Sequence, residues 1–192
     1  MADSLEGLKR THHCCQLRDT DINKQVVLMG WVQHRRDHGG VVFIDLRDKE
    51  GITQIVFNPE NSKAIHKRAQ EIRNEYVIGV KGKVIARPAD MLNPNMETGA
   101  IEVLIDELNI FSRATTPAFQ IEDRVEASES IRLQYRYLDL RRPQLKNNIL
   151  ARHKATMAIR NYLDNNGFVD IETPFLTKST PEGARDYLVP SR

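Results

Sequence analysis

The run of residues 31–47 decides the fold, and it reads WVQHRRDHGGVVFIDLR. In 41–47, apolar residues alternate with Phe43 and two charged residues, which is the period of a β-strand with one buried face. The paired glycines before this strand accept the positive φ angles that a tight reversal needs. The run therefore predicts a hairpin in which strand 25–36 is followed by a turn at 37–40 and by strand 41–47.

The sequence that follows supplies the remaining elements of a small barrel. We expect a strand at 52–57, a helix with Ile65, Ala69, Ile72 and Tyr76 on its apolar side, a strand at 76–87, a loop at 87–99 and a strand at 101–111. Five short strands with a helix between the third and the fourth form the order of an OB-fold, which commonly binds single-stranded nucleic acid.

The pattern changes after residue 111. Residues 112–126 show little periodicity, 128–139 favour a short helix, 143–166 a long helix and 168–174 a strand. We therefore expect an OB-fold domain at 1–111, a hinge at 112–142 and the beginning of a second, α+β domain at 143–192.

Composition limits the function classes. The chain has 192 residues, of which 40% are hydrophobic and 28% charged, a balance typical of a globular protein. No apolar run approaches the roughly 20 residues that span a bilayer, and the polar N-terminus has no apolar signal core, so we expect a cytoplasmic location. Lys and Arg number 28 against 26 Asp and Glu, so a nucleic-acid site must be a local cluster.

The only cysteines, Cys14 and Cys15, are adjacent. Neighbouring cysteines cannot cross-link distant parts of a fold, and no other cysteine completes a zinc site, so no metal site is expected. Small buried or half-buried thiols are favoured over a redox role.

Phe43 is the first candidate for nucleic-acid binding. Alternation places its ring on the polar face of its strand, near the arginine pair at 35–36, and an aromatic ring beside cationic groups can stack on a base while the cations hold phosphates. The alternatives are that Phe43 packs under a loop and that the arginines form a solvated strand end. Further polar candidates, each also compatible with an ordinary surface residue, are Gln54, Arg87, Asn93 and Glu102.

Two C-terminal runs carry a resemblance to a family. Residues 136–142 read RYLDLRR, and residues 167–187 read GFVDIETPFLTKSTPEGARDY. The long helix, the Gly-aromatic pair, the strand and Pro174 resemble motif 1 of class II aminoacyl-tRNA synthetases. Together with the run at 31–47, the TPEGARDY segment resembles the bacterial type of aspartyl-tRNA synthetase.

This resemblance implies a reaction in two steps. Aspartate attacks ATP to give aspartyl-adenylate and pyrophosphate, and the terminal adenosine of the tRNA then takes the aspartyl group, with Mg²⁺ balancing the phosphate charge. The implied partners are tRNA(Asp), with tRNA(Asn) as a second candidate, and a second copy of the chain.

The resemblance also implies roles for individual residues. Phe43 matches an aromatic that stacks on an anticodon base, Arg36 and Gln54 match contacts to the anticodon loop, and Glu102 matches a contact to the first anticodon base. Arg87 and Asn93 are expected to join them. His38, in the turn, is a candidate for discrimination between tRNA(Asp) and tRNA(Asn), and the alternative is a turn histidine without a reading role.

In the second domain, the resemblance places Pro174 at a dimer interface and Glu182 in a mobile loop over the amino acid, where its carboxylate would hold the substrate ammonium. The ATP-binding motifs 2 and 3 are expected beyond Arg192. We therefore expect an N-terminal fragment of an aspartate–tRNA ligase, with no catalytic residue and no bound ATP or Mg²⁺ in this chain.

Two other readings stay open on the sequence. An asparaginyl or lysyl synthetase is disfavoured by the Asp-His-Gly-Gly turn and by the Pro-Glu-Gly-Ala-Arg loop. A free-standing OB-fold module that binds single-stranded nucleic acid would have no use for the motif 1 helix or for the loop of Glu182.

Overall fold

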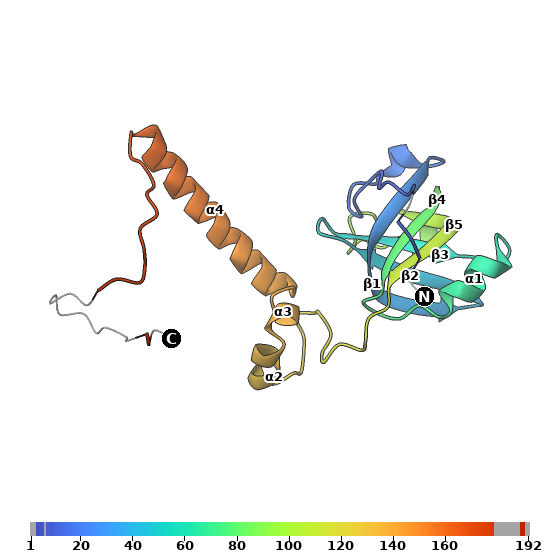
Figure 1. Cartoon of the computed structure of the whole chain (residues 1–192). Helices are drawn as coiled ribbons and strands as arrows, with labels where there is room; N and C mark the ends of the chain where they lie inside the picture. Colours follow the sequence, from blue (N-terminus) through green and yellow to red (C-terminus); the bar gives the residue numbers. More distant parts are fainter. Residues whose placement is uncertain (1–2, 6, 179–188, 191–192) are drawn as a thin grey trace. The chain divides into compact units, whose positions relative to one another are not determined.

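The computed structural model describes residues 3–5, 7–178 and 189–190. The chain divides into two compact units, Met1–Ala118 and Phe119–Arg192, which are drawn in Figure 1 and are described separately below.

The first unit is a closed barrel of five strands. The strands are β1 (Gln25–His38), β2 (Val41–Arg47), β3 (Ile52–Phe57), β4 (Val77–Ala86) and β5 (Ile101–Ser112). They close in the order β1-β2-β3-β5-β4, with β3 and β5 parallel and all other neighbours antiparallel. The helix α1 (Lys63–Ala69) lies between β3 and β4 in the chain (Figure 1). The expected OB-fold is confirmed.

The barrel encloses one apolar core, because each strand turns alternate side chains inward. Fully buried members come from every strand; among them are Leu28, Ile44, Ile55, Val80 and Ile105. The inward face of the hairpin is therefore occupied by the aliphatic residues that alternation assigned to it.

The β1–β2 hairpin is longer than the sequence predicted. β1 continues to His38, so the turn is only Gly39-Gly40, with φ angles of 59° and 77°. The register shifts between Val32 and His34, so Gln33 has no direct partner and forms a bulge. This extra residue reverses the alternation and places Arg36 opposite Phe43.

The helix is shorter than the sequence predicted. α1 ends at Ala69, and Ile72 and Tyr76 are buried in the loop that leads to β4. This loop contains Glu75 in a left-handed conformation, with φ 64°. Apolar residues of a loop can continue the spacing of a helix, so the pattern overestimated its length.

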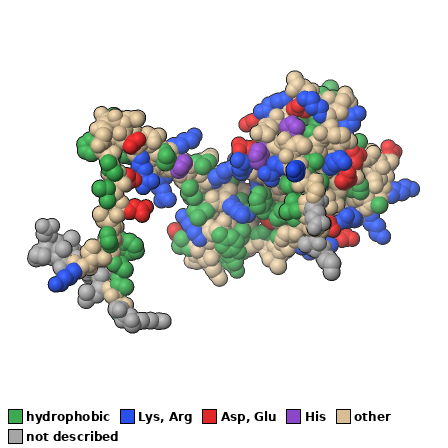
Figure 2. All heavy atoms as spheres, turned by 45° about the horizontal axis from the view of Figure 1, so that its top comes forward, with side chains coloured by type: hydrophobic (Ala, Val, Ile, Leu, Met, Phe, Trp, Pro, Cys, Tyr) green, Lys and Arg blue, Asp and Glu red, His purple; other side chains and the backbone are tan. Residues whose placement is uncertain are grey.

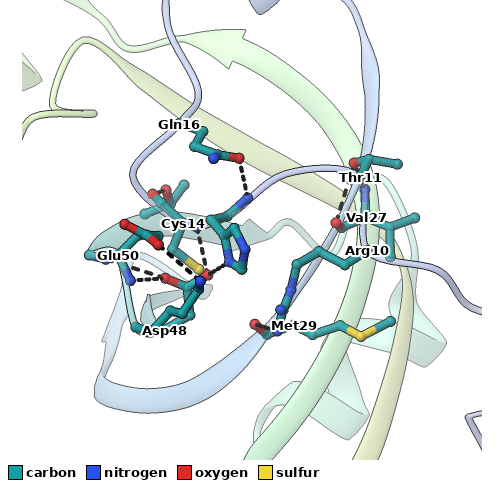
Figure 3. Close-up of polar contacts among 12 residues, drawn as sticks. Arg10, Thr11, Cys14, Gln16, Val27, Met29, Asp48 and Glu50 are labelled. Carbon is teal, nitrogen blue, oxygen red and sulfur yellow. Dashed lines mark hydrogen bonds and ion pairs between the residues drawn. The ribbon is translucent and has the colours of Figure 1, made fainter. Parts of the chain in front are cut away.

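The segment before β1 includes the short 3-10 helix η1 (Asp19–Asp21) and is tied to the β2–β3 turn by Asp48. The Asp48 carboxylate accepts the backbone N–H of Cys14 at 3.0 Å and contacts His13 Nδ1 at 2.8 Å (Figure 3). It also accepts the N–H groups of Glu50 and Gly51.

The two cysteines are small packed thiols, as expected. Cys14 is buried and Cys15 is half-buried. Desolvation by burial raises the pKa of Cys14 far above its ordinary value. Burial, together with a hydrogen bond to Glu97, raises the pKa of Cys15 to about 11. Both groups are therefore thiols rather than reactive thiolates at neutral pH.

The second unit contains α2 (Glu129–Gln134), α3 (Arg136–Asp139) and α4 (Pro143–Asn165). Phe119, Ile121 and Leu138 form a small buried cluster, and the carboxylate of Asp139, the residue after Leu138, is buried as well. That carboxylate accepts hydrogen bonds from Arg136 at 2.6 Å and Arg142 at 2.8 Å. Residues 119–142 are thus held by ion pairs as well as by a small core.

The long helix α4 begins with Pro143, which suits the first helical position, and it ends before Gly167, with φ 82°. The predicted strand at 168–174 was wrong, because these residues have no regular secondary structure. A strand needs a hydrogen-bonding neighbour, and every strand in the described residues belongs to the barrel. No helix within the described ranges is long and apolar enough to cross a membrane.

Candidate nucleic-acid interface

Cross-strand pairing brings the candidate residues to the outer face of the barrel. Directly paired residues of neighbouring strands share a face. One row across the face is Arg36, Phe43 and Val56, and the next is His34, Asp45 and Gln54. Three candidates from three strands, Arg36, Phe43 and Gln54, therefore lie in adjacent rows.

Arg36 is held in place by its neighbours on the next two strands. Its Nη2 donates to Asp45 Oδ1 at 2.7 Å and to Gln54 Oε1 at 3.2 Å. The Arg36 side chain is 54% exposed, whereas that of Asp45 is 8% exposed. A buried acceptor thus positions an arginine whose guanidinium is still accessible to a ligand.

Gln54 links Arg36 to the far side of the interface. Its Nε2 donates to Glu102 Oε2 at 2.8 Å, and Glu102 lies 4.0 Å from Arg87 Nε. Arg87 also donates from Nε to the carbonyl oxygen of Ile101 at 3.0 Å. The resulting chain of contacts, which we call the polar network, consists of Arg36, Asp45, Gln54, Glu102 and Arg87.

Burial affects the titration of the network's inner pair. Desolvation raises the pKa of Glu102, although the hydrogen bond from Gln54 and the charge of Arg87 oppose the rise. Desolvation also lowers the pKa of Arg87, against the attraction of Glu102 and Asp45. The two opposite charges therefore offset part of each other's desolvation in this partly dehydrated site.

Phe43 lies on the outer face, between Arg36 on β1 and Val56 on β3, and it is half-buried. Val56 is only 5% exposed, yet it does not belong to the core cluster inside the barrel. The outer face thus has a small apolar patch of its own beside the polar network. An aromatic ring at the edge of such a patch offers a surface on which a base can stack.

The remaining candidates are not members of the polar network. The Asn93 side chain accepts the N–H of Asn95 within the β4–β5 loop, which shapes the loop that follows η2 (Ala89–Met91). His38 is exposed at the end of β1, and Pro174 is exposed in the second unit. Glu182 lies outside the described residues.

Asp45 is the residue that sequence reasoning missed. Asp45 shares the polar face of its strand with Phe43. It was not a candidate, because a carboxylate is not expected to contact phosphates. Its role depends on the register that puts it opposite His34 and Gln54 and within reach of Arg36.

The wider surface is not uniformly basic. On the face of the barrel unit seen in Figure 2, Lys and Arg side chains are interspersed with Asp and Glu. Across the described ranges, no group of three or more His, Cys, Asp or Glu is arranged to hold a metal ion.

Two family models match the chain. Residues 26–111 match the OB-fold nucleic acid binding domain, and residues 128–192 match the class II tRNA synthetases of the D, K and N group.

Curated relatives are similar over the whole chain. An aspartate–tRNA(Asp/Asn) ligase of Desulfosudis oleivorans is 61% identical over 192 residues, which are 100% of this chain and 32% of that protein. An enzyme of the same name from Halothermothrix orenii is 55% identical over 192 residues, again 100% of this chain and 32% of that protein. The chain therefore spans about a third of the length of these relatives.

Solved structures resemble the chain in fold. The aspartyl tRNA synthetase of Entamoeba histolytica superposes with a TM-score of 0.79 at 23% identity, over 92% of this chain and 42% of that one. The asparaginyl-tRNA synthetase of Pyrococcus horikoshii gives a TM-score of 0.74 at 25% identity, over 88% of this chain and 39% of that one.

Proposed function

Because this chain belongs to the class II tRNA synthetases of the D, K and N group, we propose that it recognises the anticodon for an aspartate–tRNA ligase. The observation that carries this proposal is the polar network beside Phe43, on the outer face of the domain that matches a nucleic-acid-binding family.

Each part of the interface has a separate task in this proposal. The Phe43 ring stacks on an unpaired anticodon base. Gln54 and Glu102 present amide and carboxylate groups, which read donors and acceptors on base edges. Arg36 supplies a charged donor to the phosphate backbone while Asp45 fixes its position.

The network also favours specificity over indiscriminate binding. Glu102 is partly buried, so a base that offers it no donor leaves its carboxyl group poorly compensated. The cost of an unmatched buried polar group is about 1–3 kcal/mol, and more for a charged one. Arg87, held between Glu102 and the carbonyl oxygen of Ile101, keeps the carboxylate oriented. Asn93 contributes by shaping the β4–β5 loop, in which it lies.

The second unit is proposed to begin the catalytic domain. The class II family uses ATP, and the complete reaction would join aspartate to tRNA through aspartyl-adenylate, with ATP and Mg²⁺ bound by residues beyond Arg192. Glu182 is proposed to contact the aspartate ammonium. Within this chain, the first unit is proposed to bind tRNA, and Glu182 is the one residue proposed to contact a substrate of the reaction.

A second copy of the chain is the proposed partner of the second unit. No residue of α4 is buried, and the helix exposes Ile149, Leu150, Met157 and Ile159 among others. Figure 2 shows hydrophobic side chains on the surface of this unit. Apolar side chains exposed in this number mark a surface that is covered in an assembly. Pro174 is proposed to lie in the same interface. The proposed location of the protein is the cytoplasm.

The exposed His38 is proposed to influence whether tRNA(Asn) is also accepted. It lies at the tip of the hairpin that carries Arg36 and Phe43, where it is accessible to a bound anticodon loop. The names of the relatives, which include both tRNA(Asp) and tRNA(Asn), motivate the same proposal.

The alternative of a free-standing OB-fold module is not favoured, because residues 128–192 match the class II synthetase family. An asparaginyl or lysyl enzyme is also not favoured, since relatives that are 55–62% identical over nearly the whole chain are aspartate–tRNA(Asp/Asn) ligases.

The experiment that tests the proposal measures binding of the 192-residue chain to the anticodon stem-loop of tRNA(Asp). We expect selective binding that weakens with salt, with a log–log slope of about −0.7 per phosphate contacted. The control is a stem-loop of equal length and charge with an unrelated anticodon. Equal affinity for both would refute anticodon recognition.

A further inference from the structure

A polar cavity lies in the barrel unit, and no member of the polar network lines it. Its volume is about 590 Å³, and it is lined by the second half of β1, by the loop between α1 and β4 and by the segment after β5. The polar side chains around it are Arg35, Arg73, Asn74, Thr115 and Thr116.

The cavity has the charge of an anion site. Two guanidinium groups line it, and none of the described residues that line it is Asp or Glu. Arg35 pairs through Nη2 with the exposed Asp37 at 3.3 Å, but its Nε is buried without a hydrogen-bond partner in the described part of the chain. A buried donor without a partner costs stability unless a ligand or water satisfies it.

The loop that carries Arg73 and Asn74 is held in a fixed conformation. Glu75 follows them with φ 64°, and its backbone N–H donates to the carbonyl oxygen of Val32 at 2.6 Å. The Glu75 carboxylate accepts two hydrogen bonds from Arg47 Nη2, at 2.8 and 3.0 Å. These contacts attach the loop to β1 and to the end of β2, so the cavity wall is formed before any ligand binds.

We propose that this cavity binds a phosphodiester and the adjoining ribose of the tRNA backbone, outside the anticodon bases. A volume of this size exceeds that of one phosphate and suits a sugar-phosphate unit. Arg35 and Arg73 neutralise the phosphate, and the hydroxyl and amide groups of Thr115, Thr116 and Asn74 match the 2′-hydroxyl that distinguishes RNA from DNA.

The position of the cavity relative to Arg36 supports one continuous ligand. Arg35 and Arg36 are consecutive on β1, so Arg36 serves the outer face while Arg35 lines the cavity. An RNA strand that passes the end of β1 is thus held at two places. This inference rests on the proposed function and adds a second backbone contact to it.

The test is the substitution Arg73→Gln in the 192-residue chain, because Arg73 is exposed and its replacement leaves the core intact. Affinity for the tRNA(Asp) transcript should fall about 3-fold to 10-fold, and the magnitude of the salt slope should decrease by about 0.7. Arg73→Lys should retain most of the slope because the charge remains. The matched control is Arg113→Gln, an exposed arginine that pairs with Glu71 and does not line the cavity, and its affinity should be unchanged.

Two results would overturn the assignment. One is an unchanged affinity and slope in Arg73→Gln while Phe43→Ala still weakens binding, which would leave the anticodon proposal intact. The other is a result in an NMR titration with inorganic phosphate alone, in which the shifts of the Thr115 and Thr116 amide signals saturate at submillimolar concentration while wild type and Arg73→Gln bind tRNA equally well. The cavity would then bind free phosphate rather than the tRNA backbone. Failure of the proposed function itself would appear differently, as wild-type binding without preference for tRNA(Asp).

Discussion

Asp48 anchors the N-terminal segment to the barrel, and replacing it with Asn should destabilise the first unit. The Asp48 side chain is 2% exposed and satisfies three backbone N–H groups, those of Cys14, Glu50 and Gly51. In Asp48→Asn, one carboxylate oxygen becomes an NH₂ group, which cannot accept the N–H of Cys14.

The magnitude follows from these contacts. A buried N–H that loses its acceptor costs about 1–3 kcal/mol, and the two remaining hydrogen bonds lose the contribution of a charged acceptor, about 1 kcal/mol in total. The free energy of unfolding should therefore fall by about 2–4 kcal/mol. For a unit of this size, the Tm should fall by about 8–16 °C.

The same carboxylate predicts a pH dependence. Burial alone would raise the pKa of Asp48, but the backbone N–H groups and His13 together lower it below its ordinary value of 3.8. A lowered pKa contributes stability that is present above 3.8 and is lost as the pH falls through the folded-state pKa. The difference in Tm between wild type and Asp48→Asn should therefore become smaller as the pH falls below 3.8.

The assay is thermal unfolding followed by circular dichroism between pH 3 and pH 7, with Asp90→Asn as the control. Asp90 is an exposed carboxylate in η2, and its substitution should change the free energy of unfolding by less than about 0.5 kcal/mol. A Tm of Asp48→Asn within about 2 °C of wild type at pH 7 would show that Asp48 does not hold the segment.

Three other substitutions test the interface and the barrel. Arg36→Gln keeps a donor toward Asp45 but removes the charge, so affinity for the anticodon stem-loop should fall about 3-fold to 10-fold, with a salt slope smaller by about 0.7 in a titration series. His38→Leu, in a full-length enzyme with this sequence, should raise the ratio of tRNA(Asp) to tRNA(Asn) aminoacylation, and an unchanged ratio would dismiss its role. In Gly82→Ala the new methyl group would collide with the backbone of Leu104 on β5, so calorimetry should show a free energy of unfolding lower by about 1–3 kcal/mol. An unchanged free energy of unfolding would mean that the two strands separate easily.

The hairpin was predictable because its signals are local. Alternation in 41–47 predicted β2 with its observed bounds, and its aliphatic residues identified the core face. The glycine pair located the turn, although β1 runs two residues further into it than predicted. The bulge at Gln33 was not predictable, because only pairing with β2 shows which residue of β1 is extra. The position of Arg36 beside Asp45 depends on that bulge.

The candidate site was predictable in its residues but not in its connections. Alternation placed Phe43 on the outer face, and Gln54 was a candidate as a polar residue of a predicted strand. The hydrogen bond from Gln54 to Glu102, in contrast, joins residues that are 48 positions apart in the chain. The cavity near Arg35 left no signal in the sequence, since its walls come from three separate segments. The prediction of a strand at 168–174 was wrong because a local sequence pattern does not supply the neighbouring strand that a β-strand needs.

Base stacking by Phe43 is tested by the affinity of Phe43→Ala and Phe43→Tyr for the anticodon stem-loop of tRNA(Asp). Stacking on one base contributes roughly 1–3 kcal/mol, so Phe43→Ala should bind about 5-fold to 150-fold more weakly, whereas Phe43→Tyr should retain most of the affinity because the aromatic face remains. The half-buried ring lies outside the core cluster, so the Tm of Phe43→Ala should fall by only a few degrees. Normal binding by folded Phe43→Ala, together with a large fall in its Tm, would show that the ring does not stack on a base and that Phe43 is a purely structural residue.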